Sequence, residues 1–128
     1  FDAYWKLNWA IKEVSSKQKV VSINGEMWLQ NPINGFFYSL RKRSDVFLTL
    51  IQGTASYVFD EWVRLILEER EQLTAQFNDE IVVLIKDGGE SRMEELCFRA
   101  IKKLNDKLKL NRELGIGVQV GTRYSDIH

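Results

Sequence analysis

The chain has 128 residues, of which 45% are hydrophobic and 12% aromatic, enough for one domain with a core or for one piece of a larger domain. No apolar run approaches the ~18 residues that a membrane span needs, so we expect no membrane partner. A single cysteine excludes an internal disulfide. Together with the lack of a secretory leader, it indicates a reducing, cytoplasmic compartment. Residues 45–100 carry twelve acidic and five basic side chains between two basic ends, which is unlike a free-standing nucleic-acid-binding domain.

The first 44 residues are expected to form a helix and a small sheet. In residues 1–17, apolar side chains at helical spacing, with Trp5 and Trp9 beside them, predict a helix that packs in a core. In residues 19–40 the apolar runs are short. Asn24-Gly25 between two of them predicts a type I′ hairpin turn, because both central positions of that turn need φ > 0. A second turn and a strand at 36–40 complete a predicted three-stranded antiparallel meander.

Residues 45–70 are predicted to be the longest helix, since apolar side chains recur every three or four residues. Gly53 inside it costs about 1 kcal/mol relative to alanine, which indicates that something approaches the backbone closely there. One candidate is another helix, and the other is a ligand or nucleic-acid backbone. Arg41-Lys42-Arg43, just before this helix, are expected to be a solvated surface or to meet phosphate.

The next stretch, residues 73–85, has two apolar arms around a polar tip, Asn78-Asp79-Glu80, which predicts a β-hairpin. Ser91 with Glu94 forms the pattern of a capping box and predicts a helix to about residue 109, with Cys97 on its apolar face. A last strand is predicted at 116–120, followed by a short tail.

Antiparallel strands mixed with helices in this order indicate an α+β fold, with helices packed on one face of an antiparallel sheet.

The residues on their own favour little chemistry beyond the hairpin tip. The lone histidine, His128, is the last residue of the sequence, and no glycine-rich phosphate loop is present. A metal-dependent phosphoryl-transfer site needs carboxylates that converge from different segments, and this chain offers Asp79 and Glu80 from one segment. A solvated acidic turn and a metal site both remain open from the chemistry alone.

Three stretches then suggest a family. "LIQGTASYVFDEW", then "AQFNDEIVVL", and "GVQVGTRYSDIH" at the end resemble, in order and spacing, the C-terminal palm portion of family A (DNA polymerase I-like) DNA polymerases, most closely the phage replicative branch. The resemblance covers residues 45–128. It implies that residues 1–44 are a connecting helix and meander that return from the fingers to the palm.

The resemblance implies a role in template-directed DNA replication for each matched residue. Asp79 matches the palm aspartate that ligates two Mg²⁺ ions, and Glu80 matches its supporting acid. Gln52 and Gln76 match glutamines beside the primer–template minor groove, where acceptor atoms are present at every base pair. His128 matches a C-terminal histidine near the active site. Asn78, which stands where the family has histidine, is expected to contact the primer backbone, and we include Arg43 among the DNA-binding residues.

The resemblance also implies partners, because this chain lacks other family motifs. The first catalytic aspartate segment and the fingers helix are absent, so we expect the fingers, thumb and remaining palm on another polypeptide, with primer–template DNA and dNTP as ligands. Leu48 replaces a minor-groove asparagine of the family. A non-catalytic, palm-like interaction module is the alternative, and an unrelated α+β domain is a third.

Overall fold

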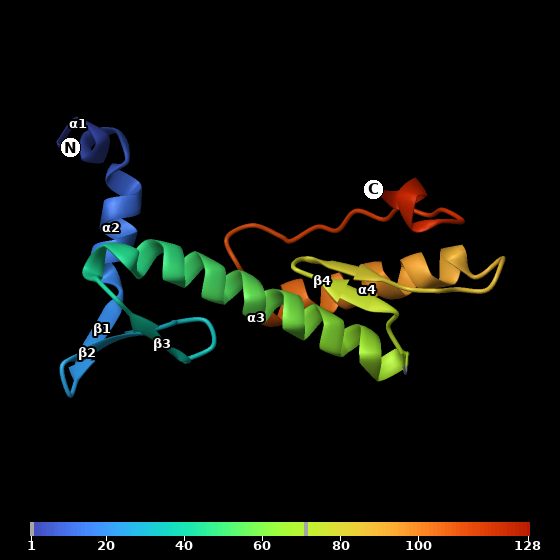
Figure 1. Cartoon of the computed structure of the whole chain (residues 1–128), viewed down its shortest axis with the longest axis horizontal. Helices are drawn as coiled ribbons and strands as arrows, with labels where there is room; N and C mark the ends of the chain where they lie inside the picture. The colour runs from blue at the N-terminus through green and yellow to red at the C-terminus, as the bar shows by residue number, and fades with distance from the viewer. Residues whose placement is uncertain (1, 71) are drawn as a thin grey trace. The chain divides into compact units, whose positions relative to one another are not determined.

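The computed structural model describes residues 2–70 and 72–128 (Figure 1). Two short helices, three strands, a long helix, two strands and a further helix follow one another, with 3-10 turns before the long helix and near the end. The chain forms two compact units, Phe1–Tyr57 and Val58–His128, which we describe separately. The division falls inside the long helix, whereas the boundary predicted from the sequence, between residues 44 and 45, lies just before that helix.

The first unit contains the predicted meander. Strands β1 (Lys19–Ile23), β2 (Glu26–Gln30) and β3 (Phe37–Leu40) pair antiparallel in the order β1-β2-β3. Ile23 pairs with Glu26, so Asn24 and Gly25 alone form the turn, with φ of 53° and 81°. Both values are positive, as a type I′ turn requires. The hairpin prediction is therefore confirmed, and the third strand begins one residue later than predicted.

The sheet of the first unit packs on the start of α3 (Val46–Glu69). Leu29 and Leu40 from the sheet form a buried cluster with Val46 and Leu50 from the helix. Asn31 is fully buried beside this cluster. Its amide donates to Thr54 Oγ1 at 2.9 Å and accepts from the Ile33 amide at 2.9 Å. A buried amide needs such partners, because leaving it unpaired costs about 1–3 kcal/mol.

Gly53 does have a close neighbour, but it is a tyrosine ring from β3. A Cβ atom at Gly53 would lie 2.7 Å from Cζ of Tyr38, inside any normal contact. The Tyr38 hydroxyl donates to the Gly53 carbonyl at 3.4 Å and accepts from Asn34 Nδ2 at 3.2 Å. The prediction of a close approach is confirmed. A side chain from a strand fills the space, so the predicted helix is not the neighbour. The alternative, a ligand or nucleic-acid backbone, stays a prediction.

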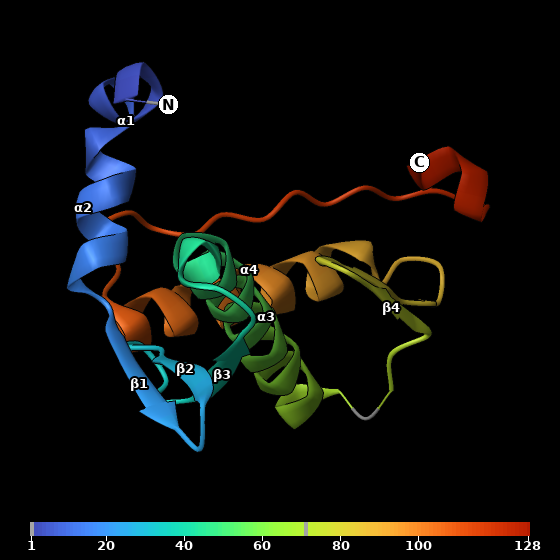
Figure 2. The ribbon, with the colours of Figure 1, turned by 60° about the vertical axis from the view of Figure 1, so that its left-hand side comes forward.

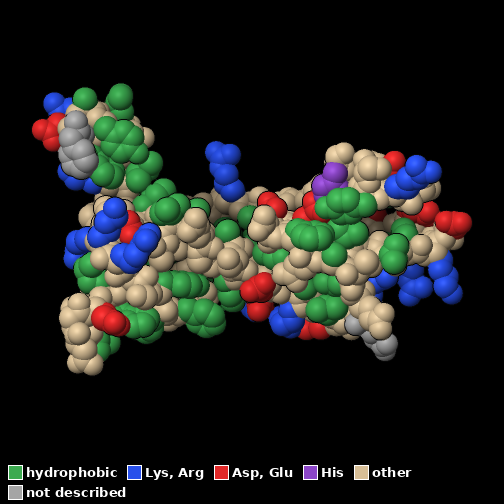
Figure 3. All heavy atoms as spheres, in the orientation of Figure 1, with side chains coloured by type: hydrophobic (Ala, Val, Ile, Leu, Met, Phe, Trp, Pro, Cys, Tyr) green, Lys and Arg blue, Asp and Glu red, His purple; other side chains and the backbone are tan. Residues whose placement is uncertain are grey.

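The N-terminal segment departs from the prediction in two ways. It forms two helices, α1 (Asp2–Leu7) and α2 (Trp9–Lys17), which meet at Asn8 with a non-helical ψ of 37°. Neither helix has a buried residue, and Leu7 and Trp9 are 83% and 65% exposed. Figure 3 shows hydrophobic side chains on the surface of this segment. The prediction of core packing is wrong, because no described element of the chain covers the apolar face.

The second unit is built on the part of α3 from Val58 onward and on α4 (Glu90–Leu108). Its core combines Ile66 with Leu96, Cys97 and Ala100, and the indole of Trp62 donates to the Cys97 carbonyl at 3.3 Å. The predicted burial of Cys97 is confirmed. Strands β4 (Ala75–Phe77) and β5 (Glu80–Val82) form a separate two-stranded hairpin, which lies beside α4 in Figures 1 and 2.

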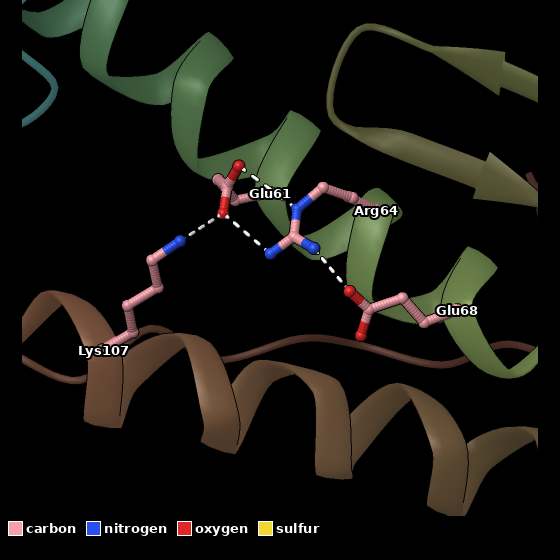
Figure 4. Close-up of polar contacts among 4 residues, drawn as sticks. All are labelled: Glu61, Arg64, Glu68 and Lys107. Carbon is pink, nitrogen blue, oxygen red and sulfur yellow. Dashed lines mark hydrogen bonds and ion pairs between the residues drawn. The ribbon is translucent and has the colours of Figure 1, made fainter.

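A polar network links the two helices of this unit (Figure 4). Glu61 on α3 accepts from Lys107 on α4 at 2.7 Å and from Arg64 at 3.2 Å, and Arg64 also contacts Glu68. The hydrogen bonds from Lys107 and then Arg64 lower the pKa of Glu61, and the hydrogen bond to Glu61 raises the pKa of Arg64. Glu61 is therefore charged at neutral pH and pairs with both cations.

The start of α4 and the segment after it differ from the prediction. The helix begins at Glu90 after Gly89, and no side chain caps its first turn, so the predicted Ser91–Glu94 capping box is wrong. Beyond the helix, the predicted strand at 116–120 is also wrong. Among the described residues no strand lies beside it to pair, and glycines at 115 and 117 leave few side chains to pack. Asn105 anchors this segment instead, with hydrogen bonds of 2.8 and 2.9 Å to the Leu114 backbone.

The predicted fold class is confirmed. The chain is α+β, with antiparallel sheets and helices packed alongside them, although its strands form two sheets. Across residues 2–70 and 72–128, no helix combines the length and the apolar character that crossing a membrane requires.

Candidate functional site

The hairpin of β4 and β5 places Asp79 at an exposed tip. Phe77 pairs with Glu80, so Asn78 and Asp79 are the only two residues of the turn. Asn78 has φ of 42°, a left-handed conformation that asparagine tolerates better than most residues. Both turn residues are exposed. The sequence therefore predicts correctly the hairpin and the position of Asp79 at its apex.

The last eight residues fold into a small compact turn. A 3-10 helix, η2, covers Tyr124–Ile127. The Asp126 carboxylate accepts hydrogen bonds from the backbone amides of Thr122 and Arg123, at 3.1 and 3.0 Å, and from the Thr122 hydroxyl at 3.1 Å. Gly121 packs so closely on Asp126 that a Cβ there would lie 2.5 Å from that residue's Cβ. These contacts fix the direction in which the final residue points.

That final residue reaches the hairpin. Nε2 of His128 lies 2.8 and 3.0 Å from the two carboxylate oxygens of Glu80, the first residue of β5. The other ring nitrogen lies 3.2 Å from the Tyr124 carbonyl. The Tyr124 ring stacks on the imidazole at 4.1 Å between centroids and meets Phe77 of β4 edge-on at 6.4 Å. We call these four side chains, Phe77, Glu80, Tyr124 and His128, the hairpin–tail contact.

The hairpin–tail contact favours a charged imidazole. The hydrogen bond to the Tyr124 carbonyl raises the pKa of His128 most, and the Glu80 carboxylate raises it further. Both ring nitrogens face acceptors, and only the imidazolium form donates from both. When the imidazole is protonated, the tail places a positive charge against Glu80, one residue from Asp79.

The donor set of the tip fits part of a two-metal site and does not complete one. Asp79 presents an exposed carboxylate, whereas the Glu80 carboxylate is already engaged by His128. Within residues 2–70 and 72–128, no three His, Cys, Asp or Glu side chains converge. Mg²⁺ is usually held by one or two carboxylates together with waters and substrate phosphates, so the second donor would have to come from another segment.

The remaining predicted site residues are exposed and lie apart in the chain. Gln76 is on β4, opposite Ile81, in the same hairpin as Asp79. Gln52 and Arg43 belong to the first unit, on α3 and at the start of η1 (Arg43–Asp45). Of the three neighbouring cations, Arg41 and Lys42 lie 3.9 and 4.0 Å from Asp45. The described residues give Arg43 no ion pair.

The predicted site residues do not include its aromatic part. Tyr124 stacks on the imidazole, and Phe77 meets Tyr124 edge-on. One signal was available. Tyr124 and His128 are four residues apart, a spacing that places two side chains on the same face of a helical turn.

Comparison with models of protein families, with characterised proteins and with solved structures gave no match.

Proposed function

We propose that this chain is the C-terminal palm segment of a template-directed DNA polymerase, active only with a second polypeptide that supplies the fingers, thumb and remaining palm. The observation that carries this proposal is the contact between Glu80 and His128. These residues come from two of the three polymerase-like stretches, 48 positions apart, and they meet at 2.8 Å. The contact brings the hairpin stretch and the C-terminal stretch together, as the resemblance implies.

The chemistry of the tip supports the same function. Asp79 is an exposed carboxylate that could serve as one segment's ligand in a shared metal site, whereas the neighbouring Glu80 is hydrogen-bonded to His128. With the second polypeptide in place, Asp79 would help to hold two Mg²⁺ ions, which would activate the primer 3′-hydroxyl and stabilise the charge on the transferred phosphate. This chain's own part is to fix Asp79 at a rigid two-residue turn. Asn78 and Gln76 flank it with amides that would face the primer terminus.

The first unit would supply the remaining contacts to DNA. Gln52 would meet the minor groove, and Arg43 would meet a backbone phosphate. Both side chains are exposed, and the described residues leave Arg43 without an ion pair. The uncovered apolar side chains of α1 and α2 fit a piece that packs against a further polypeptide.

The decisive experiment is primer extension with the complementing polymerase polypeptide, dNTPs and Mg²⁺. Asp79→Asn should lower extension by orders of magnitude and leave primer–template binding nearly unchanged. Asp87→Asn is the matched control, since Asp87 is an exposed acid in the loop before α4 and lies away from the tip. Normal extension by Asp79→Asn would overturn the proposal. Co-purification of the chain with a larger polymerase polypeptide would support it.

A second candidate is a palm-like interaction module without catalysis. Two observations favour it: Asn78 replaces the family's histidine, and Glu80 is occupied by His128. The two candidates differ in metal binding at the complete complex. With the partner present, Mn²⁺ added in place of Mg²⁺ should broaden the NMR signals of Asp79 first if the tip is catalytic. An interaction module predicts no selective broadening.

A further inference from the structure

We propose that a groove on the second unit, away from the hairpin tip, binds a short acidic peptide segment that carries apolar side chains. The groove has a volume of about 680 Å³ and lies between the end of α3, the chain that follows β5 and the first turns of α4. We call it the cationic groove and define it by its basic rim and apolar floor. We use the word rim for its basic lining residues, Arg70, Lys86, Arg92 and Arg99, and the word floor for its apolar lining residues, Leu84, Ile85, Met93 and Leu96. The inference does not depend on the proposed polymerase function.

The rim is basic, although the second unit that carries it is acidic overall. The second unit as a whole carries fourteen acidic and eleven basic side chains, yet the groove is lined by four basic residues and one acid, Glu69. Figure 3 shows blue side chains gathered near the loop that precedes α4. An isolated positive surface on an acidic unit selects a ligand of opposite charge by electrostatic complementarity.

The four cations differ in what they already bind. Arg70 is fully engaged, because it donates to the carbonyls of Gln72 at 2.8 Å and Leu84 at 2.6 Å and so holds the wall of the groove. Arg99 pairs with Glu69 at 3.0 Å. Lys86 and Arg92 are exposed and make no ion pair with any described residue. These two can accept a ligand's carboxylates directly, and Arg99 can do so when Glu69 releases it.

The floor favours a ligand that also carries apolar side chains. Leu84 is 74% exposed, although its backbone is held on both sides by Arg70 and by the Thr74 hydroxyl. An exposed apolar side chain on a fixed stretch of backbone offers a ligand apolar surface to bury. Met93 also lines the groove and can adapt to side chains of different shape. A simple anion such as phosphate would leave this surface unused.

A short peptide fits the groove better than a nucleic acid does. The described residues that line it include no aromatic ring for base stacking, which single-stranded nucleic acids generally use. The adjoining hollow shares Arg92 but contains Glu94 and Glu95, so the positive surface does not continue as a track for a phosphate backbone. The volume lies within the range of sites for small ligands. A segment of alternating acidic and apolar residues satisfies both the rim and the floor.

The test uses the full 128-residue chain and a fluorescein-labelled peptide of about eight alternating Glu and Leu residues, followed by fluorescence anisotropy. The double variant Lys86→Glu, Arg92→Glu should raise the Kd at least about tenfold, since it reverses both free charges. Lys102→Glu is the control, because it reverses an exposed cation on the same helix outside the groove. Leu84→Ser should weaken the Glu–Leu peptide several-fold and leave an alternating Glu–Ser peptide unchanged.

A gain of binding separates the proposal from damage to the fold. Glu69→Gln frees Arg99 and removes the only acid among the described residues that line the groove, so it should tighten binding by about two- to fivefold. Equal weakening by Lys102→Glu and by the double variant would overturn the proposal, as would no change in Glu69→Gln. Preferential binding of a single-stranded oligonucleotide, of inorganic phosphate or of anionic vesicles over the Glu–Leu peptide would also overturn it.

Discussion

The imidazole of His128 donates to the carboxylate of Glu80, with Nε2 at 2.8 and 3.0 Å from its two oxygens, and thereby ties the last residue of the chain to the hairpin that presents Asp79. The other ring nitrogen of His128 faces the Tyr124 carbonyl, and the Tyr124 ring stacks on the imidazole. The strength of this contact therefore depends on the protonation of one imidazole, and this dependence can be measured.

Docking of the tail should follow pH with a definite sign. The folded-state pKa of His128 is raised, first by the Tyr124 carbonyl and next by Glu80. The stabilisation is thus fully present below the ordinary histidine pKa of about 6.5 and is lost as pH rises through the raised value. NMR titration of the imidazole should show this raised pKa, and Glu80→Gln should lower it only in part. Glu113→Gln, an exposed acid elsewhere, is the control. Identical titration in wild type and Glu80→Gln would contradict the contact.

At position 53, alanine should be less favourable than glycine, which is the opposite of the usual preference inside a helix. Alanine in a helix is normally better than glycine by about 1 kcal/mol. Here the added Cβ would lie 2.7 Å from Cζ of Tyr38, so the ring must turn and lose its hydrogen bonds to Gly53 and Asn34. We expect Gly53→Ala to lower the free energy of unfolding by about 1–2 kcal/mol. In a Tyr38→Ala background the same change should become stabilising. Urea unfolding of the four proteins measures this cycle, and simple additivity would refute the packing relationship.

Loss of the Glu61 carboxylate should lower the free energy of unfolding more than loss of the Glu68 carboxylate. The Glu61 side chain is only 17% exposed and binds both Lys107 and Arg64, whereas that of Glu68 is 52% exposed and contacts Arg64 alone. We expect Glu61→Gln to cost about 1 kcal/mol and Glu68→Gln about 0.3 kcal/mol. Because the pKa of Glu61 is lowered, its contribution is present above the ordinary glutamate value of about 4.3 and is lost as pH falls through the lowered value. Thermal unfolding between pH 3 and 7 should therefore show a smaller acid destabilisation in Glu61→Gln. An unchanged pH dependence would contradict the network.

Local chemistry made much of this fold predictable. The Asn24-Gly25 turn, the hairpin around Asn78 and the long helix follow from conformational preferences of a few consecutive residues. The tip of the candidate site is predictable for the same reason, since a two-residue turn between apolar arms must expose what it carries.

Elements that depend on a tertiary neighbour were not predictable. Residues 116–120 have the composition of a strand, but a strand needs an edge to pair with, and the described chain places none beside them. The stripe on α1 and α2 has helical spacing, but spacing does not state what covers it. The Glu80–His128 contact also joins residues far apart, so only the resemblance, and no local pattern, placed His128 near the tip.

The buried thiol of the second unit can report transient opening of that unit's core. Cys97 is the only cysteine of the chain, it is 8% exposed, and burial raises the pKa of its thiol. A disulfide reagent needs an accessible thiolate, so it can react only when the packing of α3 on α4 opens transiently. The rate of thiol labelling in the native protein therefore reports how often this core opens, with no engineered probe. Applied to the Glu61 variants, it would show whether the polar network slows that opening.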